Sequence, residues 1–206
     1  MSIRSANPKD LPAIASIHKA RFPNNLLGQY STLLIAGFYR SFLGKSLFLV
    51  HDAANGIDGF VLGGEGGRLT AAKAAFLRAH LLRCLWETLL RPHVWWQEGR
   101  RRIAALVVSK QGVEIQDPPE RPTFRLLSIA VADEAVGKGV ASELVRAFDR
   151  TIRHHTTRYR LCVGKDNSRA IRFYEKMGFV HVKEDGETIE FKRQLGEETD
   201  DDCRGD

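Results

Sequence analysis

The spacing of apolar residues along this chain predicts strands and helices in alternation. Asn7-Pro8 is typical of a helix start, because asparagine caps a helix and proline suits its first position. The residues that follow at helical intervals are Leu11, Ile14, Ala15 and His18. A strand is expected before this helix, over 3–6, and a second helix after it, over 31–43.

Two strands are predicted next, SLFLVH at 46–51 and DGFVL at 58–62. Asn55-Gly56 indicates a tight turn between them, because both residues accept positive φ. The glycine-rich stretch 63–67 is expected to end the second strand. Apolar residues at helical steps then predict a helix over 68–102, interrupted at Pro92.

The second half of the chain repeats the alternation more regularly. Apolar runs predict strands at 124–131 (FRLLSIAV) and 159–163, and a hairpin over 179–195. Helices are expected over about 139–154 and 168–177, the first with an apolar face made of Val140, Leu144, Phe148 and Ile152. The predicted class is α+β in three layers, with a mixed, twisted central sheet flanked by helices and carrying a helical insertion.

Length and composition fit one globular domain over 1–195 with a basic insertion at about 67–123. The 206 residues are 43% hydrophobic and carry a formal net charge of +6, which suits an anionic ligand. Residues 196–206 are expected to form an acidic, flexible tail. Three widely spaced cysteines without metal-ligand spacing predict no metal site, and the lack of a signal peptide or long apolar run predicts a cytoplasmic protein.

A glycine-rich turn lies between the strand at 124–131 and the helix after it. Its residues are Val136, Gly137, Lys138, Gly139, Val140 and Ala141. Backbone N–H groups at a helix start lack intrahelical partners and form an anion site suited to a pyrophosphate, to which Lys138 adds a cation. The spacing matches neither GxxxxGK[ST] nor a GxGxxG that opens a βαβ unit.

A second segment makes the pattern specific. Together, SIAVADEAVGKGVASELV (128–145) and NSRAIRFYEKMGF (167–179) resemble motifs A and B of the GNAT (Gcn5-related N-acetyltransferase) superfamily. The likeness covers about 1–66 and 124–195, as in a bacterial-type member with an insertion between strands 3 and 4.

The resemblance implies an acetyl-CoA-dependent transferase and assigns roles by position. Cofactor-binding residues would be Ile129, Val131, Val136, Gly137, Lys138, Gly139, Val140, Ala141, Asn167 and Tyr174. A backbone N–H of Ile129 or Ala130 would stabilise the oxyanion, and Tyr174 would protonate the thiolate of coenzyme A. The acceptor would be an amine or hydroxyl of a small molecule, such as an amino sugar.

This chain departs from the family pattern at two positions. Val136 stands where relatives have Gln or Arg, so a side-chain donor to the phosphates is lost. Cys162 stands where some relatives have a Glu that serves as general base. The general base of this chain is therefore not identified, and the candidates are Glu65, His51, Ser128 and Asp133.

Several functional alternatives remain open at the level of sequence. The domain could be an acyl-CoA-binding module without turnover, or a transferase that modifies a protein or peptide amine, as a monomer or a homodimer. The arginine-rich insertion admits three interpretations: a packed helical hairpin, a wall over the acceptor site, or a contact with nucleic acid or a membrane surface.

Overall fold

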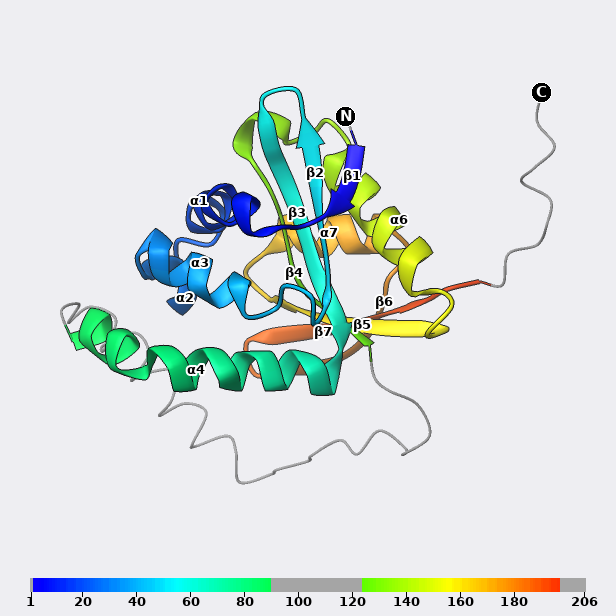
Figure 1. Cartoon of the computed structure of the whole chain (residues 1–206). Coiled ribbons are helices and arrows are strands. Elements are labelled where there is room, and N and C mark those ends of the chain that lie inside the picture. Colours follow the sequence, from blue (N-terminus) through cyan, green and yellow to red (C-terminus); the bar gives the residue numbers. More distant parts are fainter. Residues whose placement is uncertain (1, 90–123, 197–206) are drawn as a thin grey trace.

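The computed structural model describes residues 2–89 and 124–196, which build a single seven-stranded sheet (Figure 1). In chain order the strands are β1 (Ser2–Ser5), β2 (Leu47–Ala53), β3 (Gly56–Glu65), β4 (Phe124–Val131), β5 (Arg158–Gly164), β6 (Val180–Asp185) and β7 (Thr188–Gln194). Their order across the sheet is β1-β2-β3-β4-β5-β7-β6. Neighbours are antiparallel except β4 and β5, which are parallel.

Helices cover both faces of the sheet, which confirms the predicted class (Figure 1). One face carries α1 (Leu11–Arg21), α2 (Leu26–Gln29), α3 (Thr32–Arg40) and the start of α4 (Gly66–Leu89). The other carries α6 (Val140–Ile152) and α7 (Ser168–Lys176). Two short 3-10 helices, η1 (Pro8–Asp10) and η2 (Asp133–Ala135), precede α1 and α6.

The predicted start of the first helix is confirmed, with η1 as its first turn. Asn7 Oδ1 accepts a hydrogen bond from the Lys9 N–H (2.9 Å), and the Asn7 N–H donates to Asp10 Oδ2 (2.8 Å). This reciprocal cap satisfies two N–H groups that the helix leaves open. The predicted apolar face of α1, from Leu11 to His18, is buried against α3 and the sheet.

The layer of α6 and α7 on one face of the sheet is mostly apolar but contains one buried, hydrogen-bonded carboxylate. Val140, Leu144, Phe148 and Ile152 of α6 are buried as predicted. On the same helix Asp149 accepts hydrogen bonds from the Tyr159 hydroxyl (2.6 Å) and from Arg193 Nε (2.9 Å). This carboxylate therefore joins α6 to β5 and β7.

The prediction that glycines end the strand at residue 62 was wrong, because β3 runs on to Glu65. A Cβ at Gly63 would lie 2.5 Å from the Arg125 carbonyl oxygen and 2.5 Å from the Phe148 ring. Glycine at 63 thus permits a close approach within the sheet. The turn predicted before this strand is confirmed, and of its Asn55-Gly56 pair Gly56 has positive φ (111°).

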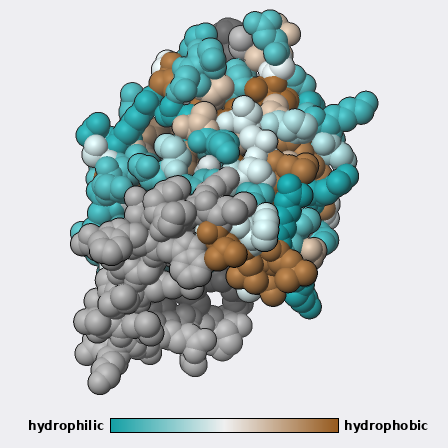
Figure 2. Space-filling model, turned by 90° about the vertical axis from the view of Figure 1, so that its left-hand side faces the viewer, coloured by the Kyte–Doolittle hydropathy of each residue, from teal (hydrophilic) through white to brown (hydrophobic). Residues whose placement is uncertain are grey.

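The insertion between β3 and β4 begins with the long helix α4. Leu69, Ala72, Phe76 and Cys84 are buried on one side of it. Other apolar side chains of the helix are exposed, namely Leu77, Leu81, Leu82, Leu85, Trp86 and Leu89. Figure 2 shows hydrophobic side chains gathered in the lower part of this face, at the height of α4. The rest of the predicted insertion, 90–123, and the acidic tail from 197 lie outside the described residues.

Candidate active site

The central feature of the site is the separation of β4 from β5. The two strands pair only at Phe124–Tyr159 and Arg125–Arg160, so β4 has no register partner on β5 from Leu126 onward. A bulge occurs at the point of separation, because Gly63 pairs with Leu126 and Leu62 with Ser128, which leaves Leu127 as an extra residue. The inner edge of β4 is therefore open along 126–131.

The direction of the β4 backbone groups determines what this open edge offers. The Ala132 N–H donates to the Asp58 carbonyl (2.7 Å), so it faces β3. Successive residues of an antiparallel strand turn their N–H groups to opposite sides, and Ala130 accordingly faces β3 as well. Ile129 and Val131 then direct their N–H and C=O groups toward the gap beside β5. Among the predicted oxyanion donors, this geometry favours Ile129 over Ala130.

The predicted phosphate loop follows directly after β4. Gly137 and Gly139 have φ of 81° and 85°, and Gly139 is the N-cap of α6. The first intrahelical bond of α6 runs from the Glu143 N–H to the Gly139 carbonyl. The N–H groups of Val140 and Ala141 therefore precede the hydrogen-bonded turns and lie at the positive end of the helix dipole.

Two of the six loop residues donate their N–H groups to carbonyls of the preceding η2. The Val136 N–H donates to the Asp133 carbonyl and the Lys138 N–H to the Ala135 carbonyl, each at 3.2 Å. For Gly137 and Gly139 there is no such bond to a backbone acceptor in the described part of the chain. The Lys138 side chain is exposed. The loop therefore has the donors and the cation that a diphosphate needs.

Tyr174 lies on α7 and Asn167 is the N-cap of this helix, on the same face of the sheet as α6. The Tyr174 ring packs against Phe173, Phe179 and Phe191, and burial raises the pKa of its hydroxyl above its usual value. Tyr174 is therefore protonated at neutral pH. Asn167 caps α7, with Oδ1 accepting from the Ala170 N–H (3.0 Å), which leaves its side-chain N–H groups for a ligand.

The four candidate bases lie in different places. His51 is buried on β2, where Nδ1 contacts Asp58 and Nε2 lies 3.5 Å from Glu143, two strands away from the gap. Asp133 forms an ion pair with Arg21, and Glu65 lies 3.3 Å from Arg68. Ser128 alone of the four lies on the open stretch of β4.

Sequence reasoning missed a hydrogen-bonded group behind Ser128. Ser128 Oγ lies 3.1 Å from the Tyr39 hydroxyl, which lies 2.7 Å from His18 Nδ1. His18 was assigned only to the apolar face of its helix. No local pattern could have revealed the contact, because Tyr39 and Ser128 are 89 positions apart.

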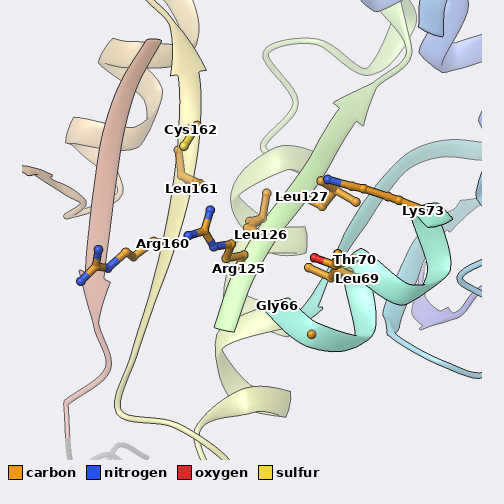
Figure 3. Close-up of a pocket in the computed structure, with 11 residues that line it drawn as sticks. Gly66, Leu69, Thr70, Lys73, Arg125, Leu126, Leu127, Arg160, Leu161 and Cys162 are labelled. Carbon is orange, nitrogen blue, oxygen red and sulfur yellow. The ribbon is translucent and has the colours of Figure 1, made fainter. Parts of the chain in front are cut away.

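A pocket of about 530 Å³ lies where β4 and β5 separate (Figure 3). It is lined by the start of α4 together with β4 and β5, and its lining includes Lys73, Arg125, Leu127, Arg160 and Cys162. Among the described residues, no group of three His, Cys, Asp or Glu could hold a metal ion. Within the same ranges, no helix is both long and apolar enough to cross a bilayer.

A family model described as "Acetyltransferase (GNAT) family" matches residues 71–179. No curated protein matches the chain. Among solved structures, Ard1 from Thermoplasma volcanium is 22% identical, with a TM-score of 0.58 and coverage of 95% of this chain and 98% of that one. SsHAT is 19% identical, with a TM-score of 0.66 and the same coverage values.

The PaiA N-acetyltransferase from Thermoplasma acidophilum, solved in complex with coenzyme A, is 15% identical. Its TM-score is 0.55, and the match covers 94% of this chain and 98% of that one. These structural likenesses establish a shared fold.

Proposed function

Because this chain belongs to the GNAT acetyltransferase family, whose members bind acetyl-CoA, we propose that it transfers an acetyl group from acetyl-CoA to the amine of a small molecule or sugar. The observation that carries the proposal is the open edge of β4 next to the loop 136–141. Both features lie on one continuous stretch of chain, so a bound thioester and its phosphates have adjacent sites.

The residues present suit the cofactor. Main-chain N–H groups of Gly137, Gly139, Val140 and Ala141 would hold the pyrophosphate with the Lys138 ammonium. The outward groups of Ile129 and Val131 would bind the pantetheine arm as a further strand would, and Asn167 would add a side-chain donor. Val136 provides only apolar contact, which predicts weaker phosphate binding than a Gln or Arg would give.

Acetyl-CoA supplies a thioester, whose carbonyl carbon is attacked by the neutral amine of the acceptor. The C–N bond would form first, to give a tetrahedral intermediate that loses the amine proton to solvent. Its collapse would break the C–S bond, and the leaving thiolate would take the proton of the Tyr174 hydroxyl, which solvent then restores. The Ile129 N–H would stabilise the negative charge on the carbonyl oxygen. One such donor contributes about 3 kcal/mol in acyl-transfer enzymes.

A second candidate function is acyl-CoA binding without turnover. Two positions favour it, Val136 in the phosphate loop and Cys162 on β5, where a catalytic carboxylate is lacking. Partial desolvation raises the pKa of the Cys162 thiol, so the thiol is largely uncharged at neutral pH and does not replace the missing carboxylate.

One assay separates the two functions. The protein is mixed with acetyl-CoA and a panel of amines, amino sugars, hydroxyl acceptors and peptides, and release of free thiol is followed above the rate without acceptor. Acceptor-dependent release supports the transferase. Acetyl-CoA binding measured by calorimetry, with no release for any acceptor, supports the binding module. Failure to bind acetyl-CoA overturns both.

A further inference from the structure

We propose that the pocket between α4, β4 and β5 binds an anionic group of the acceptor, a phosphate or carboxylate several bonds from the reacting amine. The inference rests on the proposed function, because it names the substrate class of that site. It also gives α4 a role: the insertion forms one wall of the acceptor site.

The charged residues that line the pocket are all cations. They come from three elements, Lys73 from α4, Arg125 from β4 and Arg160 from β5. Figure 3 shows the Lys73 side chain reaching from α4 to β4 beside Leu127, and the Arg125 guanidinium lying between β4 and β5. The first turn of α4 adds the positive end of its dipole on the same side.

Within residues 2–89 and 124–196, two of these cations have no carboxylate partner. Arg160 lies 3.5 Å from Glu190 on β7, so its charge is compensated. Lys73 and Arg125 form no ion pair with any carboxylate in the described ranges. Desolvation of the Lys73 ammonium and the positive charge of Arg125 lower the Lys73 pKa. An anion between the two side chains would relieve this repulsion and form charge-assisted hydrogen bonds.

The position of the cations relative to the open β4 edge limits the size of the acceptor. Lys73 reaches β4 at Leu127, and the proposed oxyanion donor is Ile129, two residues further along. At roughly 3.3 Å per residue, the two points are about 7 Å apart. An amino sugar phosphate or an ω-amino acid spans this distance, whereas the adjacent amine and carboxylate of an α-amino acid do not.

Matched acceptors test the charge preference. Glucosamine 6-phosphate is compared with glucosamine, and 4-aminobutyrate with n-butylamine, by kcat/KM at saturating acetyl-CoA. The two pairs separate phosphate from carboxylate. For at least one pair we expect the anionic member to be preferred about tenfold or more. Equal kcat/KM within both pairs would overturn the inference and leave the transferase proposal standing.

Variants then connect the preference to the pocket. Lys73→Met and Arg125→Gln should each reduce it about tenfold while the KM for acetyl-CoA changes less than twofold. Arg78→Gln removes an exposed cation from the same helix outside the lining residues and should leave the preference intact. A preference that survives both pocket variants would contradict the assignment.

Occupancy of the pocket can also be measured without turnover. Cys162 is exposed and lines the pocket, whereas Cys84 is buried. In the absence of acetyl-CoA, glucosamine 6-phosphate or 4-aminobutyrate should slow the alkylation of Cys162 by iodoacetamide, followed by mass spectrometry of its peptide. Glucosamine and n-butylamine should give no protection. Protection would support the pocket whether or not acetyl transfer to these two ligands is detected, and equal alkylation throughout would overturn the pocket.

Discussion

The Tyr39 hydroxyl lies 2.7 Å from Nδ1 of His18, in the core between α1, α3 and the sheet. Both side chains are buried, and His18 Nε2 has no hydrogen-bond partner among the residues that the structure describes. Burial lowers the pKa of His18 to about 4. The imidazole is therefore neutral at physiological pH, and the folded state resists its protonation.

This relationship predicts acid sensitivity. The unfolded chain binds a proton at His18 below about pH 6.5, whereas the folded chain does so only near pH 4. The contribution of neutral His18 to the free energy of unfolding is therefore fully present above pH 6.5. It is lost as the pH falls toward 4, by on the order of 3 kcal/mol in all. Urea unfolding at pH 7.5, 6, 5 and 4 measures this loss.

In the variant His18→Gln the new side chain does not titrate, so the free energy of unfolding should depend less on pH. The variant should be less stable than the wild type at pH 7.5. His154→Gln, which changes an exposed histidine, should follow the wild type. A wild-type dependence no steeper than that of His18→Gln would contradict the explanation.

The elements predicted correctly from the sequence are those in which the local pattern and the packing of the folded chain require the same residues. The apolar face of α6, the cap at Asn7 and the strand at 124–131 each follow from a pattern within a dozen residues. The predicted end of β3 was wrong because glycine is needed at Gly63 for a different reason. It leaves room for the Phe148 ring and the Arg125 carbonyl, which are distant in sequence. A glycine needed for close approach and one that ends a strand look alike in a sequence.

The candidate site likewise has parts that short motifs predict and parts that depend on contacts between distant residues. Loop 136–141 and Tyr174 are contained in two short motifs, so predicting them needs only local sequence. The chain of contacts from Ser128 through Tyr39 to His18 joins three elements, and the cation pair of Lys73 and Arg125 joins a helix to a strand. Such groups depend on packing geometry, which residue spacing does not determine.

Removal of the Tyr174 hydroxyl tests the proton donor. Tyr174→Phe keeps the ring contacts with Phe173, Phe179 and Phe191, so the fold and acetyl-CoA binding should persist. Loss of general-acid catalysis should lower kcat about 100-fold. Steady-state kinetics and calorimetry give the two quantities.

Tyr159→Phe is the matched control, since it removes another buried hydroxyl. It breaks the 2.6 Å bond to Asp149 and should cost about 1–3 kcal/mol of stability with kcat nearly unchanged. Full kcat in Tyr174→Phe would remove this residue from the chemistry.

Backbone strain tests the phosphate loop. Gly139 has φ of 85°, and a Cβ there would meet no atom within 4 Å, so Gly139→Ala changes only the backbone preference. Holding alanine in the left-handed region costs about 1–2 kcal/mol, so the loop should be destabilised and the KM for acetyl-CoA should rise several-fold. Gly44 has φ of 70° and equally open surroundings, far from the loop in sequence. Gly44→Ala should lower the melting temperature similarly and leave the KM unchanged, and the same KM change in both variants would argue against a phosphate site.

Restoring a donor at Val136 tests the same loop by gain of affinity. Val136 is partly buried at the end of η2, directly before the two positive-φ glycines. In Val136→Arg the guanidinium can reach a phosphate bound to the loop, and a charge-assisted pair of this kind should lower the Kd for acetyl-CoA about tenfold at low salt. The gain should shrink as salt screens the charge, because exposed pairs weaken when the Debye length falls.

Val136→Leu adds bulk without a donor and should leave the Kd unchanged. Calorimetry at 20 and 300 mM NaCl measures both effects. An arginine variant that binds no more tightly than the leucine variant would place the phosphates away from this loop.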